Sequence, residues 1–173
     1  MGLTLTVGRP KDVFQRSYAR SVVSELQRIA PGSLTYPLFM QPWHSEELAW
    51  SGWALLQSSV SEALGNPEQS HIKAVDAWCG VFLPLELTPL VVEVPGSATP
   101  LQVASAWSLE RELRAFAERR GLPTVESDLR ALFDRYLANN DQADSDLDIQ
   151  VYSQLMQAVG VARRRRQPLW IVK

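Results

Sequence analysis

The chain has 173 residues, a length that fits one domain or at most two small ones. With 46% hydrophobic and 21% charged residues, it has the composition of a folded globular protein, which excludes disorder over the whole chain. The net charge of −2 argues against general nucleic-acid binding, and the single cysteine cannot form an internal disulfide bond. One cysteine suits a reducing compartment, so we expect a cytoplasmic protein.

The first half of the chain predicts one strand and three helices. Residues Leu3–Val7 alternate between apolar side chains and threonine, which is the pattern of a strand with one buried face. In three longer segments, apolar residues recur at steps of three and four, with capping residues or glycine at the ends. We therefore expect helices over Asp12–Ala30, over Ser45–Leu64, and from Asn66 to Cys79 or Phe82, with a proline-punctuated loop over Ser33–Trp43.

The second half predicts a strand, three more helices and a final strand. Leu90–Val94 is apolar and is bracketed by two prolines, as expected of a short strand. Helical periodicity then returns over Thr99–Arg120, Val125–Ala138 and Asp146–Arg164. Leu169–Val172 is apolar on both faces, which predicts a strand in the centre of a sheet.

The order of these elements indicates an α/β protein that is rich in helices. Strands separated by long helical blocks usually join one sheet through crossover connections. We therefore expect a single globular domain over residues 1–173, with a small three-stranded sheet, mixed or parallel, and about six flanking helices. Leu169–Val172 would be the central strand, with Leu3–Val7 and Leu90–Val94 beside it.

No catalytic motif is visible in the sequence. It has no glycine-rich phosphate loop, no Gly-x-Ser-x-Gly nucleophile turn and no zinc-type spacing of cysteine and histidine. His44 and His71 are expected at opposite ends of a helical hairpin, too far apart to share a metal ion. Cys79 is expected to be a buried, unreactive thiol, because Lys73 is the only cation near it in sequence. We expect neither a metal nor a cofactor.

Two charged clusters have structural explanations. Asp144, Asp146 and Asp148 match the first three calcium positions of an EF-hand loop, but the glycine and the final glutamate of that loop are missing. The run Arg163–Arg166 falls in the last turn of the final predicted helix, where positive charge is favourable. No aromatic surface or second basic run accompanies it, so we do not expect nucleic-acid binding.

The unusual feature of the chain is a long segment with almost no positive charge. From Ile29 to Glu110 the only cation is Lys73, against eight acidic residues, and this segment holds five of the six tryptophans. The helix expected over Ser45–Leu64 has no charged residue outside its two ends. Such a segment must be covered, either by the rest of the protein or by a partner.

This segment has two interpretations. In the first, the tryptophan-rich helix is the central helix of the domain and is covered on both sides by its own chain. In the second, tryptophans line a groove that binds another protein, and the nearby acids favour a basic partner. The residues expected in such a site are Trp43, His44, Glu47, Trp50, Gln57 and Trp78.

The leading hypothesis is a non-catalytic cytoplasmic protein that binds another protein or a second copy of itself. The alternative is a small-molecule-binding protein or an enzyme, with a pocket near Trp43, His44, Glu47 and Trp50. His44 would then carry a proton near neutral pH. We expect no membrane partner, because the most apolar stretch, Val81–Val94, is interrupted by prolines and glutamates.

Overall fold

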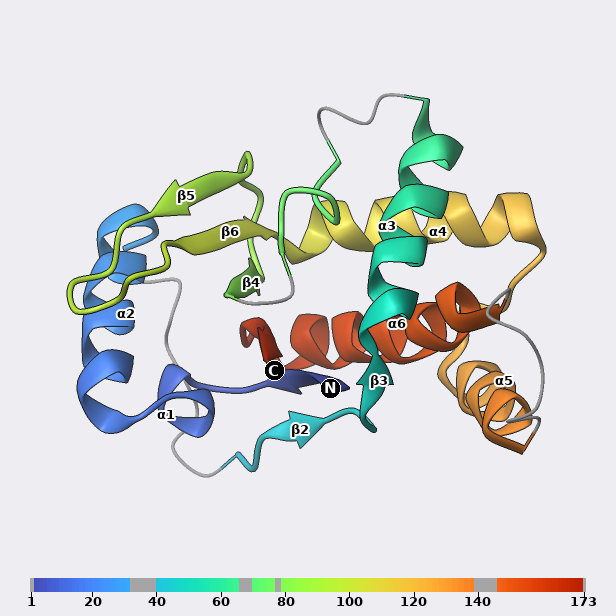
Figure 1. The fold of residues 1–173 in the computed structure, drawn as a ribbon, viewed down its shortest axis with the longest axis horizontal. Helices are drawn as coiled ribbons and strands as arrows, with labels where there is room; N and C mark the ends of the chain where they lie inside the picture. Colours follow the sequence, from blue (N-terminus) through green and yellow to red (C-terminus); the bar gives the residue numbers. More distant parts are fainter. Residues whose placement is uncertain (1, 32–39, 66–69, 77–78, 139–145, 173) are drawn as a thin grey trace.

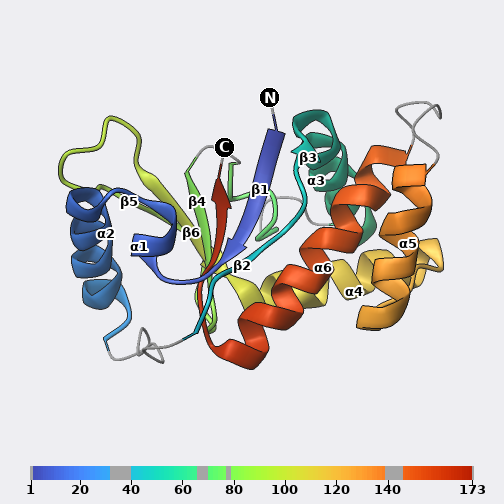
Figure 2. The ribbon, with the colours of Figure 1, turned by 90° about the horizontal axis from the view of Figure 1, so that it is seen from below.

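The computed structural model describes residues 2–31, 40–65, 70–76, 79–138 and 146–172. These residues form an α/β structure of three layers, in which one mixed sheet lies between two groups of helices (Figures 1 and 2). Two separate buried apolar clusters occupy the two faces of the sheet. The predicted class is confirmed, but the sheet is larger than predicted, because seven strands rather than three lie in the described part of the chain.

The sheet has the strand order β2-β1-β7-β4-β6-β5, and β3 pairs with β1 beside this path. β4 and β6 run parallel, whereas the other paired strands are antiparallel. The strands are β1 (Gly2–Val7), β2 (Trp43–His44), β3 (Leu48–Ala49), β4 (Gly80–Leu83), β5 (Leu90–Val92), β6 (Leu101–Ser105) and β7 (Leu169–Val172).

The C-terminal strand β7 lies in the middle of the sheet, as its two apolar faces predicted. Leu169 and Ile171 belong to one apolar cluster and Trp170 to the other, and all three are at most 3% exposed. β7 pairs with β1 on one side, as expected, but with β4 on the other. The prediction that Leu90–Val94 neighbours β7 is wrong, because β5 lies at the edge of the sheet, where Val91 is 62% exposed.

Helices cover both faces of the sheet. α1 and α2 lie against one face, and α3 to α6 lie on the other (Figure 2). In the described residues the helices are α1 (Pro10–Val13), α2 (Arg16–Ile29), α3 (Trp50–Leu64), α4 (Ala106–Arg120), α5 (Glu126–Ala138) and α6 (Leu147–Arg165). α3 and α6 pack closely at Gly52, where an added Cβ would lie 2.8 Å from the carbonyl oxygen of Leu147.

The helix predicted over Ser45–Leu64 begins only at Trp50. The residues before it form β2 and β3, which pair with β1. The Ser45 hydroxyl, expected to cap the helix, instead accepts a hydrogen bond from the backbone N–H of Leu5 at 3.0 Å. Because Ser45 binds the sheet instead of capping a helix, α3 begins at Trp50, five residues later than the predicted cap.

Two strands lie where the sequence pattern allowed helices: Leu101–Ser105 was predicted as helical, and Gly80–Leu83 was included as far as Phe82 only in the longer alternative for the third helix. Gly80–Leu83 forms β4, and Leu101–Ser105 forms β6 before α4 begins. Both strands are almost entirely buried, so they lack the alternation that would have revealed them. Residues 71–74 form a turn, and Asn66–Gln69, where a helix was predicted to begin, lies outside the described residues.

The predicted helix over Asp12–Ala30 is divided into α1 and α2. The backbone of Phe14 is extended, with φ −117° and ψ 157°, and this residue separates the two helices. Its ring packs edge-on against the ring of Trp170, with 5.2 Å between the centroids. Packing onto the central strand therefore accounts for the break. The last two predicted helices agree with α5 and α6 to within a few residues.

Replacing Trp170 with alanine should lower the free energy of unfolding by about 3–5 kcal/mol, the usual cost of removing a fully buried aromatic side chain. The indole is completely buried, and its Nε1 donates a hydrogen bond to the carbonyl oxygen of Gly8 at 2.8 Å. Urea unfolding measures this loss. Trp170→Phe should cost less than Trp170→Ala, because it keeps the contact with Phe14 and loses the bond to Gly8. A loss below about 1 kcal/mol in Trp170→Ala would contradict a central position.

Candidate functional site

The residues that the sequence suggested as a binding site are found in different roles. Trp43 and His44 form β2; Trp43 is half-buried against the core, whereas His44 is exposed and its Nδ1 lies 2.9 Å from Thr6 Oγ1. Glu47 is exposed between β2 and β3, and Trp50, also half-buried, begins α3.

Gln57, another of the predicted residues, binds groups within the protein. The side-chain amide of Gln57 donates to the carbonyl oxygens of Ile72, at 2.8 Å, and of Val75, at 3.0 Å. Gln57 therefore holds the segment after residue 70 against α3. Trp78 lies outside the described residues. None of the predicted residues that are described lines any of the three cavities discussed below.

A cluster of polar residues that the sequence analysis missed lies at the carboxyl ends of the parallel strands β4 and β6. Ser105 ends β6, and its hydroxyl caps α4 by accepting a hydrogen bond from the N–H of Ser108 at 3.1 Å. Glu86 follows β4 and binds Arg111 of α4 through two hydrogen bonds, at 2.6 and 3.1 Å. In open α/β sheets, ligands characteristically bind outside this edge of the strands.

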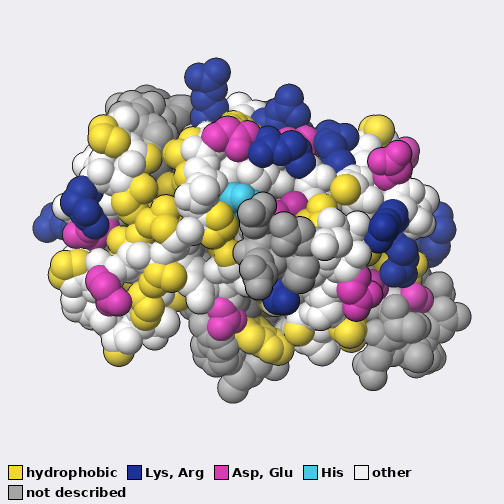
Figure 3. All heavy atoms as spheres, turned by 90° about the horizontal axis from the view of Figure 1, so that it is seen from above, with side chains coloured by type: hydrophobic (Ala, Val, Ile, Leu, Met, Phe, Trp, Pro, Cys, Tyr) yellow, Lys and Arg dark blue, Asp and Glu magenta, His cyan; other side chains and the backbone are white. Residues whose placement is uncertain are grey.

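His71 adjoins this cluster and is held in one tautomer. Its Nδ1 accepts a hydrogen bond from the backbone N–H of Ser105 at 3.1 Å, so Nε2 carries the proton of the neutral ring. Burial and the nearby Arg111 lower the pKa of His71, and Glu86 only partly opposes this effect. Figure 3 shows one face of the molecule, on which several acidic and basic side chains lie close to one another. His71 is therefore a neutral hydrogen-bonding group at neutral pH.

The carboxylate of Glu112 fixes the turn that carries His71. It is only 7% exposed and accepts hydrogen bonds from the Ser70 hydroxyl and from the backbone N–H groups of His71 and Ile72. Burial raises the pKa of Glu112, although these three bonds lower it. All three hydrogen bonds of the Glu112 carboxylate go to residues 70–72 of the turn. The role of Glu112 is therefore to position His71 rather than to bind a ligand.

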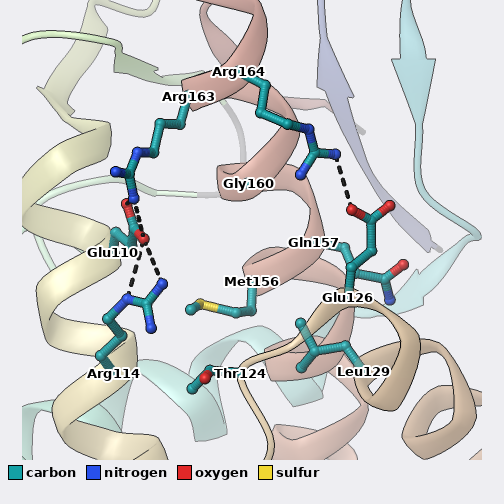
Figure 4. A pocket seen from close by; sticks show the side chains of 10 residues that line it. All are labelled: Glu110, Arg114, Thr124, Glu126, Leu129, Met156, Gln157, Gly160, Arg163 and Arg164. Atoms are coloured by element: carbon teal, nitrogen blue, oxygen red, sulfur yellow. Dashed lines mark hydrogen bonds and ion pairs between the residues drawn. The ribbon is translucent and has the colours of Figure 1, made fainter.

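Two adjoining cavities extend from this cluster along α4 and α6. Their volumes are about 390 and 360 Å³, and they share Glu110, Arg114 and Arg163 in their walls. We call this surface the arginine groove and define it by Arg111, Arg114, Arg163 and Arg164. Figure 4 shows its second part, where Arg163 and Arg164 extend from α6 to opposite walls.

Carboxylates pair with the arginines of the groove. Glu110 accepts from Arg114 Nη2 at 2.8 Å and from Arg163 Nη1 at 3.1 Å, and Arg164 Nη2 lies 3.0 Å from a carboxylate oxygen of Glu126. With the Glu86–Arg111 pair, four guanidinium groups face three carboxylates, so the lining carries one excess positive charge.

The wall formed by α6 is open at Gly160. Among the described residues outside the backbone of its own helix, the nearest atom to a Cβ added there would be Arg164 Nη1, at 3.5 Å, an ordinary contact distance. A glycine inside a helix costs about 1 kcal/mol relative to alanine. Packing therefore gives no reason for glycine at this position, but any larger side chain would reduce the cavity.

The predicted position of the run Arg163–Arg166 at the end of a helix is confirmed, because α6 ends at Arg165. The sequence did not show that the run is divided between different contacts. Arg163 and Arg164 line the groove, and Arg165 Nη1 donates to the carbonyl oxygen of Gln41 at 2.8 Å. Arg166 follows the helix as its C-cap residue, with φ +52°. Glu110 and Arg114 are four residues apart in one predicted helix, so their proximity could be predicted from the sequence. The ion pair between Glu110 and Arg163 could not.

Comparisons with protein-family models, curated proteins and solved structures find no match to this chain. In the described residues, no group of three or more His, Cys, Asp or Glu side chains is placed to hold a metal ion. None of the described helices combines the length and the apolar character needed to cross a bilayer.

The structure predicts opposite effects for two glycine substitutions. Gly160→Ala should raise the free energy of unfolding by about 0.5–1 kcal/mol, because it improves helix propensity without a clash. Gly52→Ala should lower it by about 1–2 kcal/mol, because the new methyl group would press on Leu147 and Val151 of α6. Chemical denaturation of both variants measures the two changes. Equal effects would contradict the described packing of α6.

His71 should make stability depend on pH below neutrality. Its lowered pKa means that the folded protein binds this proton less readily than the unfolded chain. The contribution of neutral His71 to the free energy of unfolding is therefore complete above the usual histidine pKa of about 6.5. It is lost as pH falls below that value, because the unfolded chain takes up the proton first. His71→Asn keeps an acceptor near Ser105 but does not titrate, so wild type should lose stability relative to this variant between pH 7.5 and pH 5. Urea unfolding at several pH values tests this, and parallel curves would contradict it.

Proposed function

We propose that this protein binds a small anionic molecule, carrying a phosphate or carboxylate group, in the arginine groove. The observation that carries this proposal is the convergence of four arginines from two helices on adjoining cavities with only three carboxylates. Each cavity has a volume in the range typical of small-ligand sites, about 300–1,000 Å³.

Unused hydrogen-bond donors support this proposal. A guanidinium group has five N–H donors in a planar arrangement that matches carboxylate and phosphate oxygens. Arg163 donates to Glu110 from Nη1, and Arg164 approaches Glu126 with Nη2, at 3.0 Å. Their remaining donors can therefore bind an anion while the existing pairs hold the side chains in place.

The charge balance also favours an anion. The groove carries one excess positive charge, although the whole chain has a net charge of −2. Exposed ion pairs contribute only about 0–1 kcal/mol to folding, so the network is not explained by stability alone. A ligand with one negative charge would neutralise the excess, and its oxygens would accept hydrogen bonds from the arginine donors that the glutamates leave free.

The site differs from those suggested by the sequence. The small-molecule alternative placed a pocket near Trp43, His44, Glu47 and Trp50, but the groove lies on α4 and α6. A protein-binding surface at these tryptophans is less favoured by the geometry, because Trp43 and Trp50 pack against the core and Gln57 binds backbone carbonyls.

Isothermal titration calorimetry with inorganic pyrophosphate and with citrate tests the proposal, with glycerol as a neutral control. Arg163→Gln should weaken binding of the better anion at least tenfold, because it removes a positive charge from both cavities. Gly160→Leu should abolish binding by filling the cavity, while circular dichroism and thermal unfolding show that the variant is folded. Binding by wild type should weaken as salt concentration rises.

Arg130→Gln is the matched control. Arg130 is exposed on α5 and makes no hydrogen bond or ion pair with the described residues, so its loss should change affinity less than twofold. Two results would contradict the proposal: no binding of either anion by wild type at millimolar concentration, or equal weakening by Arg130→Gln and Arg163→Gln.

A further inference from the structure

A third cavity, of about 420 Å³, lies on the opposite side of the sheet, along α1 and α2. Its apolar floor is formed by Pro10, Ala19 and Val23, and its rim by the cations Lys11, Arg16 and Arg20. Arg9 also lines it and is paired with Asp12. We call this surface the α1–α2 groove. No acidic residue is among the described residues that line it.

Three of the four cations that line this groove have no ion pair among the described residues. Lys11, Arg16 and Arg20 make no ion pair with any described residue, whereas every arginine of the arginine groove is paired. Three adjacent cations without acidic partners repel one another, and an acidic partner would relieve this repulsion. Their concentration is notable in a chain whose net charge is −2.

The shape of the groove is elongated. Arg16, Arg20, Val23 and Gln27 line it at steps of four, three and four residues, which places them in one stripe along α2. Eleven residues of helix span about 16 Å. A stripe of this length matches two to three turns of a helix laid alongside, which is a common mode of peptide recognition.

We infer that the α1–α2 groove docks an acidic, partly apolar segment of another protein. The apolar side chains of that segment would cover Val23 and Pro10, and its carboxylates would bind Arg16, Arg20 and Lys11. This site shares no lining residue with the arginine groove, so each proposal is tested independently of the other.

Selection from a phage-displayed library of random 12-residue peptides tests this inference, with the doubly substituted variant Arg16→Glu/Arg20→Glu used for counter-selection. Arg16 is the first residue of α2 and Arg20 is exposed, and glutamate is favourable at a helix N-terminus, so this variant should fold. Enriched peptides should combine several Asp or Glu with leucine-like residues spaced three or four apart.

Fluorescence anisotropy with the most enriched labelled peptide then measures affinity. Arg16→Glu/Arg20→Glu and Val23→Asp should each weaken binding at least tenfold, whereas Arg130→Glu, a charge reversal of the same kind on α5, should change it less than twofold. A peptide with serine in place of its apolar residues should also bind at least tenfold more weakly. Enrichment of basic or uncharged peptides, or equal weakening by Arg130→Glu, would overturn the inference. So would binding of the groove to phosphatidylglycerol vesicles with no peptide enriched.

Discussion

The burial of β7 on both of its faces is the constraint on which the rest of the structure depends. Trp170 contacts the cluster beneath α2, while Leu169 and Ile171 contact the cluster beneath α3 to α6. A strand with two apolar faces is stable only when helices cover both sides of the sheet. Because α6 leads into β7 after a few residues, this strand also fixes where the arginines at the end of α6 lie.

The parts of the fold that the sequence predicted well are those in which local pattern and tertiary packing agree. α5, α6 and β1 have clear periodicity, β7 is a short run that is apolar on both faces, and the positions of all four agree with prediction to within a few residues. The parts predicted wrongly are those in which long-range contacts override local signals. Ser45 binds the backbone of Leu5 across the sheet instead of capping a helix, and β4 and β6 are too fully buried to show alternation. These two strands, together with the short strands β2 and β3, are the four that the predicted sheet lacked.

The same distinction applies to the candidate site. The sequence placed Arg163–Arg166 at a helix end, which is a local property, but the pairing of Arg163 with Glu110 joins residues 53 positions apart. Glu112 did offer a signal: it lies three residues after Leu109 and four before Phe116, on the apolar face of its helix. An acidic residue at such a position is rarely buried without partners, and its partners are the turn that holds His71.

The two grooves differ in how their positive charge is balanced, and this difference affects what each can bind. In the arginine groove, an incoming anion must reach the arginine donors that the paired glutamates leave free, so geometry as well as charge decides whether it binds. In the α1–α2 groove, the rim cations Lys11, Arg16 and Arg20 have no acidic partner among the described residues, so charge alone attracts a partner and the apolar floor adds selectivity. Selective recognition of a small ligand suits the first arrangement, and docking of a flexible acidic segment suits the second. The central strand β7 lies between the two grooves, and its side chains belong to the apolar clusters on both faces of the sheet.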